Sequence, residues 1–192
     1  MVSLDATIVD FFGPGMAMNA DPLHLALSLG LPPFPYPIAK CNALNATPYM
    51  TTVEHFEHLF GGTPQRSAML GDLARLVERL KAANLEPVAA LIGGSFLRSD
   101  NPAPKDLDCV LFYNGHTNDE AVEALHRLWE AFSRKRIDLR LISLQRDPLL
   151  ALKACSFFST LYGATRDQRR PATGSLLLDL RPTNPEGSHG DE

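Results

Sequence analysis

The sequence predicts one α/β domain of the α+β type, in which helices, chiefly on one face, flank a small mixed and mostly antiparallel sheet. Three observations support this class. Residues 88–92 and 106–113 are apolar runs of strand length, residues 136–142 alternate apolar and polar side chains, and amphipathic helical patterns lie around them. A chain of 192 residues is long enough for one well-cored domain and short for two.

The composition is that of an ordinary globular protein, with 45% hydrophobic and 21% charged residues. The net charge of −4 provides no general attraction to nucleic acid, although this charge is compatible with a local basic patch. No apolar run approaches the roughly 20 residues that span a bilayer, and the N-terminus lacks a secretory signal pattern. We therefore expect a cytoplasmic protein without a membrane partner. Cys41, Cys109 and Cys155 have neither disulfide nor zinc spacing and are expected to be reduced thiols.

Residues 1–50 are predicted to form an irregular N-terminal arm, residues 51–180 the domain, and residues 181–192 a disordered tail. Within the arm, a short helix is expected over residues 22–29, between an Asp cap with a following Pro and a terminating Gly. The Pro-rich run 32–37 is interpreted as an ordered segment packed along the domain. Its alternative role is a docking segment for a protein partner.

Residues 51–60 and 63–83 are expected to be helices. Thr51 or Thr52 caps the first, and a Thr-Pro pair opens the second, whose apolar residues recur at helical spacing.

His55 and His58 lie one turn apart on the first of these helices, a spacing that can bind metal. No third ligand is expected nearby and the His-Glu-x-x-His order is absent, so the two histidines are interpreted as part of a solvated face.

The most informative stretch joins the first strand to the second. Strand 88–92 enters a Gly-Gly-Ser turn at 93–95, and a spacer over 96–105 with two prolines leads to Asp106 and Asp108. Side chains alternate along a strand, so both carboxylates should project from one face. Two such anions repel unless a cation lies between them. A hard divalent ion, usually Mg²⁺, takes oxygen ligands and keeps positions open for phosphate.

The remaining elements follow in order. A capping-box pattern at 117–120 begins a helix with an apolar face. Residues 136–142 are predicted to form a strand with Asp138 and Arg140 on one face. The Asp147-Pro148 pair begins another helix, and the last strand is expected over 175–180.

Together these motifs resemble the nucleotidyltransferase superfamily typified by DNA polymerase beta. The resemblance rests on Gly94-Ser95, on Asp106-Leu107-Asp108 and on a third carboxylate, Asp138, on a later strand, and it covers roughly residues 65–143. More narrowly, the chain resembles an uncharacterised minimal branch of that superfamily associated with bacteria and phages. Its counterparts are the helix start at 51–60, the Gly-Ser-Phe turn and the Phe-Phe, basic, Gly-x-x-x-Leu ending, and no activity comes with that branch.

The resemblance implies a nucleotidyltransferase-like fold that transfers a nucleoside monophosphate from an NTP to an acceptor hydroxyl of a protein, an RNA or a small molecule, with release of pyrophosphate. It implies catalytic and Mg²⁺-binding roles, with Mn²⁺ as the alternative ion, for three carboxylates: Asp106, Asp108 and Asp138. The phosphates would lie at a helix N-terminus. The nucleotide-binding candidates are the residues of the turn and three nearby basic residues: Gly93, Gly94, Ser95, Arg98, Lys105 and Arg140.

Several alternatives stay open at this level. The fold can be a catalytically silent binding module, such as an antitoxin or a partner-recognition protein. Asp138 can be an ion-pair partner of Arg136 or Arg140, and Arg98 and Lys105 can be solvated loop charges. The basic cluster at 166–170 can bind an anionic acceptor or be an exposed loop. The sequence names neither the acceptor, the preferred base, the oligomeric state nor the role of residues 1–50.

Overall fold

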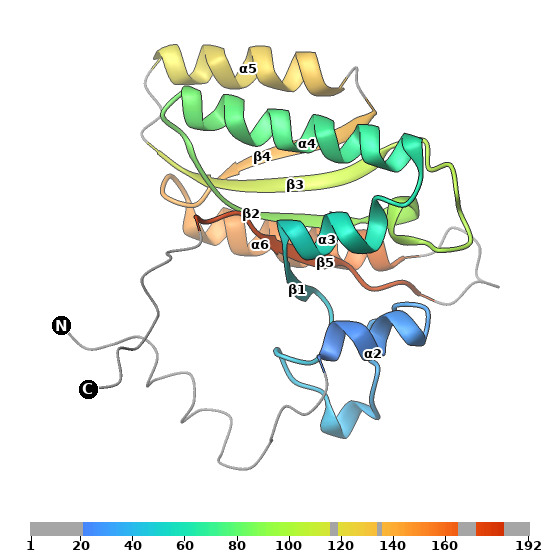
Figure 1. Ribbon diagram of the computed structural model, residues 1–192. Helices are drawn as coiled ribbons and strands as arrows, with labels where there is room; N and C mark the ends of the chain where they lie inside the picture. Colours follow the sequence, from blue (N-terminus) through green and yellow to red (C-terminus); the bar gives the residue numbers. More distant parts are fainter. Residues whose placement is uncertain (1–20, 116–118, 134–135, 165–171, 183–192) are drawn as a thin grey trace, which may run out of the picture.

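The computed structural model describes residues 21–115, 119–133, 136–164 and 172–182. Within these residues five strands form one sheet in the order β1-β5-β2-β3-β4 (Figure 1). The strands are β1 (Tyr49–Thr52), β2 (Glu86–Gly93), β3 (Leu107–Asn114), β4 (Ile137–Ser143) and β5 (Leu176–Asp179). The expected mixed α+β sheet is confirmed. It is not mostly antiparallel, because β1/β5 and β3/β4 are parallel whereas β2/β3 and β2/β5 are antiparallel.

Four of the described α-helices begin directly after a residue whose side chain caps the first turn. The described helices are α2 (Pro22–Ser28), α3 (Val53–Phe60), α4 (Pro64–Ala82), α5 (Asp119–Ser133) and α6 (Pro148–Gly163), with short 3₁₀ helices η1 (Ile38–Lys40) and η2 (Gly94–Leu97). The four capped helices are α2, α3, α4 and α6. The side chains of Thr52, Thr63 and Asp147 each accept a backbone N–H of the first turn that would otherwise lack a partner. The predicted starts of α3, α4 and α6 are therefore confirmed.

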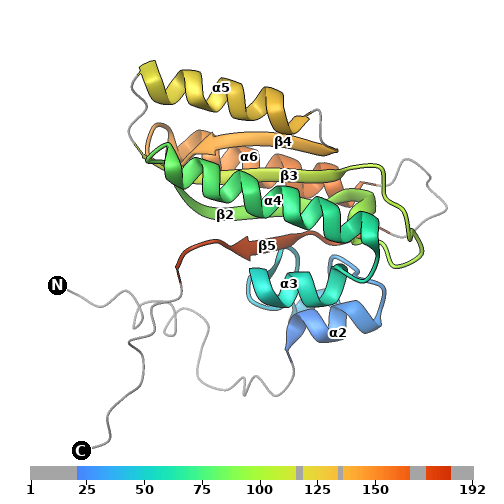
Figure 2. The same cartoon turned by 45° about the horizontal axis from the view of Figure 1, so that its top comes forward.

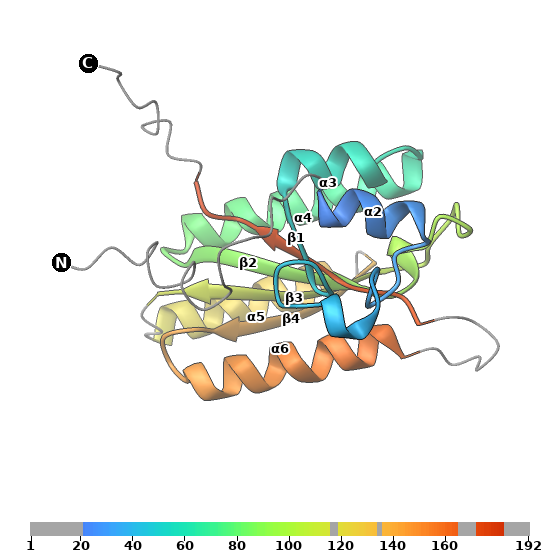
Figure 3. The same cartoon turned by 90° about the horizontal axis from the view of Figure 1, so that it is seen from below.

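The two faces of the sheet carry separate clusters of apolar side chains. Alternate residues of β3, such as Cys109 and Leu111, join the main core under α3, α4 and α5. The intervening Val110 and Phe112 pack with α6 on the opposite face. Figure 2 shows α4 and α5 side by side over the sheet, and Figure 3 shows α6 on the other side. Helices lie chiefly on one face, as expected, but α6 covers the other, where Asp108 projects.

Residues 21–50 belong to the same core as the rest of the domain. Leu23 and Leu31 are buried in the main cluster, and the Tyr49 hydroxyl donates a hydrogen bond to the carbonyl of Pro32. Thr47 N–H donates to the carbonyl of Pro33 at 3.0 Å. The Pro-rich run is thus an ordered segment packed along the domain, and the boundary expected at residue 50 falls inside β1.

Four predictions lie wholly or partly outside the described residues: the structure of 1–20, the side chains of the capping box at 117–120, the basic cluster at 166–170, and the tail from 183 onward. None of the helices in the described ranges combines the length and apolar character needed to cross a bilayer.

Candidate active site

Asp108 is the central residue of the candidate site. It is the second residue of β3 and pairs in register with Gly93 on β2 and with Asp138 on β4. Because neighbouring strands lie about 4.8 Å apart, these three residues form a row across the sheet. Both carboxylates project from the face covered by α6, since residues further along the same face of β3 and β4, Val110 and Ile142, pack in the cluster that includes α6. We call Gly93, Asp108 and Asp138 the carboxylate row.

Gly94 brings the turn against the first of these carboxylates. Its φ of +69° lies in the left-handed region that L side chains rarely adopt. A Cβ at this position would overlap the Oδ2 atom of Asp108. Only glycine therefore lets the turn and the carboxylate approach this closely, and the structure places Gly94 and Asp108 in direct contact.

The turn itself is shorter than the resemblance implies. Gly94 and Ser95 begin η2, a 3₁₀ helix of four residues rather than an α-helix. The Ser95 carbonyl accepts hydrogen bonds from the Arg98 N–H and the Asn101 side chain, both at 3.4 Å. The half-buried Ser95 is thus held in a closed turn beside the carboxylate row.

Tyr162, near the end of α6, covers the turn from the other side. A Cβ on Gly93 would overlap the Tyr162 side chain, so this glycine is required for α6 to lie close to β2. Burial, together with the negative charges of Asp108 and Asp138, raises the pKa of the Tyr162 hydroxyl. Sequence reasoning missed this residue. The sequence feature that could have pointed to it is helical spacing, because Tyr162 follows Phe158 by one turn. In the structure their ring centroids lie 5.7 Å apart.

Asp138 has an ion-pair partner in the structure. The Arg140 Nη1 atom lies 2.5 Å from Asp138 Oδ1 and also donates to the Leu139 carbonyl at 2.9 Å. Both charged side chains are about half exposed, so the pair contributes little to stability. Asp138 therefore forms the expected ion pair with Arg140, and it also belongs to the carboxylate row.

Asp106 lies at the exposed start of this region. The strand begins one residue later than predicted, at Leu107, whose N–H donates to the Arg136 carbonyl at 2.9 Å. Asp106 and Lys105 are exposed and precede the ladder. The structure thus brings Asp108 and Asp138 together in register, whereas Asp106 stands just outside the sheet.

Arg98 is engaged with a neighbouring carboxylate rather than left open. Its guanidinium makes two hydrogen bonds to Asp100, at 2.9 and 2.7 Å. This hydrogen bonding to Asp100 raises the pKa of the Arg98 guanidinium. A phosphate contact from Arg98 would require this pair to open.

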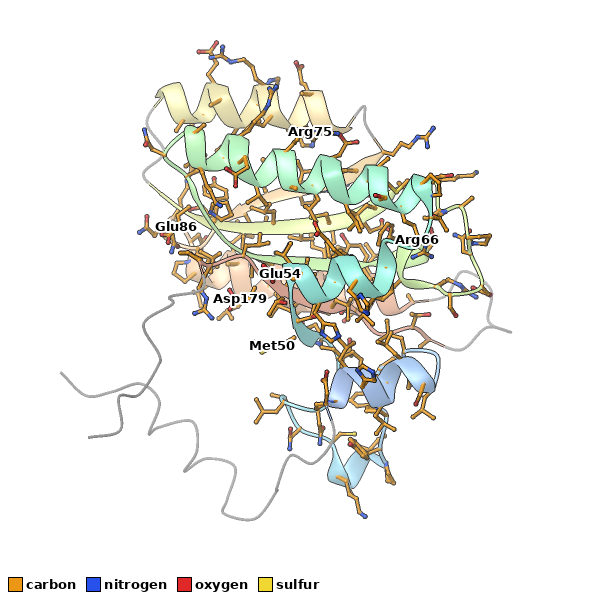
Figure 4. All side chains as sticks on the ribbon, in the orientation of Figure 1. Met50, Glu54, Arg66, Arg75, Glu86 and Asp179 are labelled. Carbon is orange, nitrogen blue, oxygen red and sulfur yellow. The ribbon has the colours of Figure 1, made fainter. Side chains whose placement is uncertain are left out.

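Arg66 determines the path of the Pro-containing spacer. It lies in the first turn of α4, is only 6% exposed, and donates to the carbonyls of Phe96, Arg98 and Asn101 at 2.6 to 2.8 Å. Its guanidinium carbon also lies 5.0 Å from the centroid of the Phe96 ring. Gln65 adds a hydrogen bond to the Pro104 carbonyl at 2.5 Å. Figure 4 shows Arg66 at the end of α4 that meets the spacer.

Arg66 was missed by sequence reasoning because its partners are backbone carbonyls some 30 residues away, which carry no sequence signal. One sequence feature could have pointed to Arg66. A basic residue in the first turn of a helix is unusual, because the helix dipole disfavours positive charge there.

A cavity of about 370 Å³ lies elsewhere, between α3, α4 and the residues that end and follow β5. Glu54 and Asp179, labelled in Figure 4, are among its lining residues. None of the candidate nucleotide or metal residues lines it. Since the carboxylate row projects toward α6, this cavity lies on the opposite face of the sheet and forms no part of the candidate site.

The described fold and site define an α+β protein in which a glycine and two carboxylates form a row across three adjacent strands, beside a tight glycine turn. This chain belongs to a family of unknown function, DUF6932, whose model matches residues 32–177. The match includes the carboxylate row and excludes α2. No curated protein and no solved structure matches the chain.

Proposed function

We propose that this protein is a Mg²⁺-dependent nucleotidyltransferase that transfers a nucleoside monophosphate from an NTP to an acceptor hydroxyl. The observation that carries the proposal is the contact between the Asp108 carboxylate and the Gly94 turn, with Asp138 in register on the next strand. A carboxylate held against a close-approach glycine is the arrangement needed to hold a metal–phosphate group over a backbone turn.

The donor set fits the ion. Asp106, Asp108 and Asp138 offer only carboxylate oxygens, which Mg²⁺ and Mn²⁺ prefer. When bound, the ions would supply charge stabilisation for the attacking and leaving oxygens of an in-line displacement. Two of the three carboxylates, Asp108 and Asp138, are in register. In this proposal the exposed Asp106 moves to join them when nucleotide binds.

The chain's own groups have distinct roles in this proposal. Backbone N–H groups of the 93–95 turn and the Ser95 hydroxyl bind the β and γ phosphates, with Arg98, Lys105 and Arg140 as further phosphate contacts. Asp138 accepts the proton of the acceptor hydroxyl. The acceptor oxygen then bonds to the α-phosphorus, the bond from that phosphorus to the bridging oxygen breaks, and pyrophosphate leaves.

The test uses the double variant Asp106→Asn with Asp108→Asn. Asparagine keeps the size of each side chain and removes the charge that binds the ion. We expect at least about a 100-fold weaker binding of Mg²⁺-nucleotide, measured by calorimetry with each of the four NTPs. Glu86→Gln is the matched control, because Glu86 is an exposed carboxylate at the other end of β2, far from Arg66 and the turn in Figure 4.

Unchanged nucleotide and Mg²⁺ binding in the double variant would show that these carboxylates hold no metal–nucleotide complex. Equal weakening by Glu86→Gln would mean that the effect is one of overall charge. Turnover is followed separately, by incubation with labelled NTP, Mg²⁺ and candidate acceptors and a search for pyrophosphate.

A second function, that of a catalytically silent binding module such as an antitoxin or partner-recognition protein, is favoured by two contacts. Arg140 already neutralises Asp138, and the Tyr162 side chain lies against Gly93 on the face where phosphate would approach. Absence of pyrophosphate with every acceptor class, together with a stable co-purifying partner, would support this second function. Labelling of a protein, RNA or small molecule would support the transferase.

A further inference from the structure

Two histidines and an aspartate meet on the edge of the molecule opposite α5. Asp21 caps α2, His24 lies in the first turn of that helix, and His55 lies in the first turn of α3. One ligand atom from each residue lies within 4.8 Å of the others. The expectation that His55 has no third ligand nearby is therefore wrong, because the missing partners come from α2, in the arm. His58, its neighbour in sequence, stays exposed and outside this cluster.

Other contacts orient all three side chains. Asp21 Oδ1 accepts the Leu23 N–H at 3.0 Å, and its other oxygen lies 3.9 Å from His24 Nδ1. His55 Nδ1 lies 3.4 Å from the Thr51 hydroxyl. The two imidazole rings are stacked, with centroids 6.2 Å apart and planes 18° from parallel. The Thr51 contact of His55 is of the kind that fixes the ring orientation of metal-binding histidines, whereas His24 is positioned by Asp21 and by ring stacking.

We propose that Asp21, His24 and His55 bind one divalent transition-metal ion, with Zn²⁺ as the best match. Two imidazole nitrogens and one carboxylate oxygen form a three-ligand set that leaves a coordination position open. Imidazole donors favour Zn²⁺ over Mg²⁺, so this site differs in metal from the carboxylate row and lies apart from it. The bound ion joins α2 to α3 and thereby fastens the arm to the domain.

Metal binding requires the three ligand atoms, now within 4.8 Å of one another, to move closer together. Zn–N bonds of about 2.0 Å in a tetrahedral site place ligand atoms roughly 3.3 Å apart. Asp21 and His24 are exposed, so their side chains can rotate to close the remaining gap. His55 is half-buried and serves as the fixed member.

The experiment titrates the metal-free full-length protein with Zn²⁺ by calorimetry and repeats the titration with Co²⁺ by absorption. We expect one equivalent of Zn²⁺ per chain, and Co²⁺ bands without thiolate charge transfer. The variants Asp21→Asn, His24→Ala and His55→Ala should each weaken binding at least about 10-fold. Asparagine is chosen at position 21 because it keeps the helix cap while removing the charge.

His58→Ala is the matched control, since it removes an exposed histidine from the same helix and should leave the affinity unchanged. Zn²⁺ at a concentration that just saturates the wild type should also raise the melting temperature of the wild type and of His58→Ala by about 5 °C or more, and should raise that of His55→Ala by less. All the substituted residues are exposed or half-buried, so the variants should fold, and circular dichroism of the metal-free variants is the check.

Three outcomes would overturn the site: less than half an equivalent of Zn²⁺ bound, equal loss of affinity in His58→Ala, or a Co²⁺ spectrum showing thiolate ligands. The carboxylate-row variants should keep Zn²⁺ binding, so failure of the proposed function and failure of this site are distinguishable.

Discussion

At the scale of single residues, Gly94 controls the contact on which the candidate site depends. Its positive φ and the closeness of the Asp108 carboxylate leave no room for a side chain. The absence of a Cβ atom at this position is what allows the backbone of the turn and the carboxylate to lie in contact.

Gly94→Ala should lower the free energy of unfolding by about 2–4 kcal/mol, because it adds left-handed strain to a steric overlap. Displacement of Asp108 should also abolish Mg²⁺-nucleotide binding. Urea denaturation and calorimetry measure the two effects. Gly71→Ala, at an open position within α4, is the control and should stabilise by about 0.5–1 kcal/mol. Equal stability of the two variants would refute the steric account.

Cys109 makes the stability of the protein sensitive to alkaline pH. Burial, with smaller effects from the charges of Asp108 and Asp138, raises the pKa of its thiol from 9.0 to about 12. Above pH 9 the thiol ionises in the unfolded chain while it stays protonated in the fold, so rising pH favours unfolding. This contribution is fully present below pH 9 and is lost between pH 9 and 12.

Cys109→Ala should therefore flatten the decline of stability with pH. The wild type should lose up to about 1.4 kcal/mol more per pH unit than the variant within that window. Urea denaturation at pH 8, 9 and 10 provides the comparison. Parallel curves for the two proteins would show that this thiol contributes nothing to the alkaline loss.

At the scale of elements, one arginine joins α4 to the spacer that follows the turn. Arg66 satisfies three carbonyls that the spacer, with its prolines, cannot satisfy by forming a helix or strand. Since the spacer connects η2 to β3, this single side chain sets the relation between the turn and the carboxylates.

Arg66→Ala should lower the free energy of unfolding by about 3 kcal/mol, because one buried and two partly buried carbonyls lose their donor. Arg66→Lys should recover only part of this, since an ammonium group cannot reach all three acceptors. Hydrogen exchange should quicken at residues 94–104 in both variants. The control is Arg75→Ala on the same helix, whose exposed pair with Asp72 is worth at most about 0.5 kcal/mol. A similar cost in Arg75→Ala would contradict the special role of Arg66.

At the scale of the whole molecule, the arm and the domain share one core. Side chains of α2 are buried in the same cluster as those of α5, which lies at the opposite edge of the sheet. β1, which follows the arm, completes the sheet by pairing with β5 near the other end of the chain. The molecule should therefore unfold as a unit.

Leu23→Ala should lower the free energy of unfolding by about 2–4 kcal/mol, because Leu23 is only 2% exposed. Fluorescence of Trp129, the single tryptophan, on α5, should report the same midpoint as circular dichroism. Leu29→Ala is the control, since that side chain is 55% exposed and should cost less than about 0.5 kcal/mol. A midpoint from Trp129 that does not shift in Leu23→Ala would show that the arm unfolds separately.

Much of the fold could be predicted from local patterns. Caps and apolar spacing located α3, α4 and α6. Strand alternation predicted that Asp106 and Asp108 share one face of their strand and that Asp138 and Arg140 share one face of theirs. β1 was missed because its sequence, Tyr-Met-Thr-Thr, does not alternate apolar and polar residues, although its side chains alternate between buried and exposed in the fold. The sequence did not predict which face of the sheet α6 covers. An apolar helix face indicates that the helix packs on the sheet, but it does not indicate which face of the sheet it covers.

Local sequence patterns were sufficient to predict the α+β class, the order of the central elements and a Gly-Ser turn followed by spaced carboxylates. These depend on periodicity and capping, which act between residues a few positions apart. Folding of the whole domain was needed to bring Asp108 against Gly94 and Tyr162 against Gly93. It also leaves Asp106 outside the ladder and brings His24 to His55. Such contacts join residues far apart in the chain, and packing of the whole domain selects them.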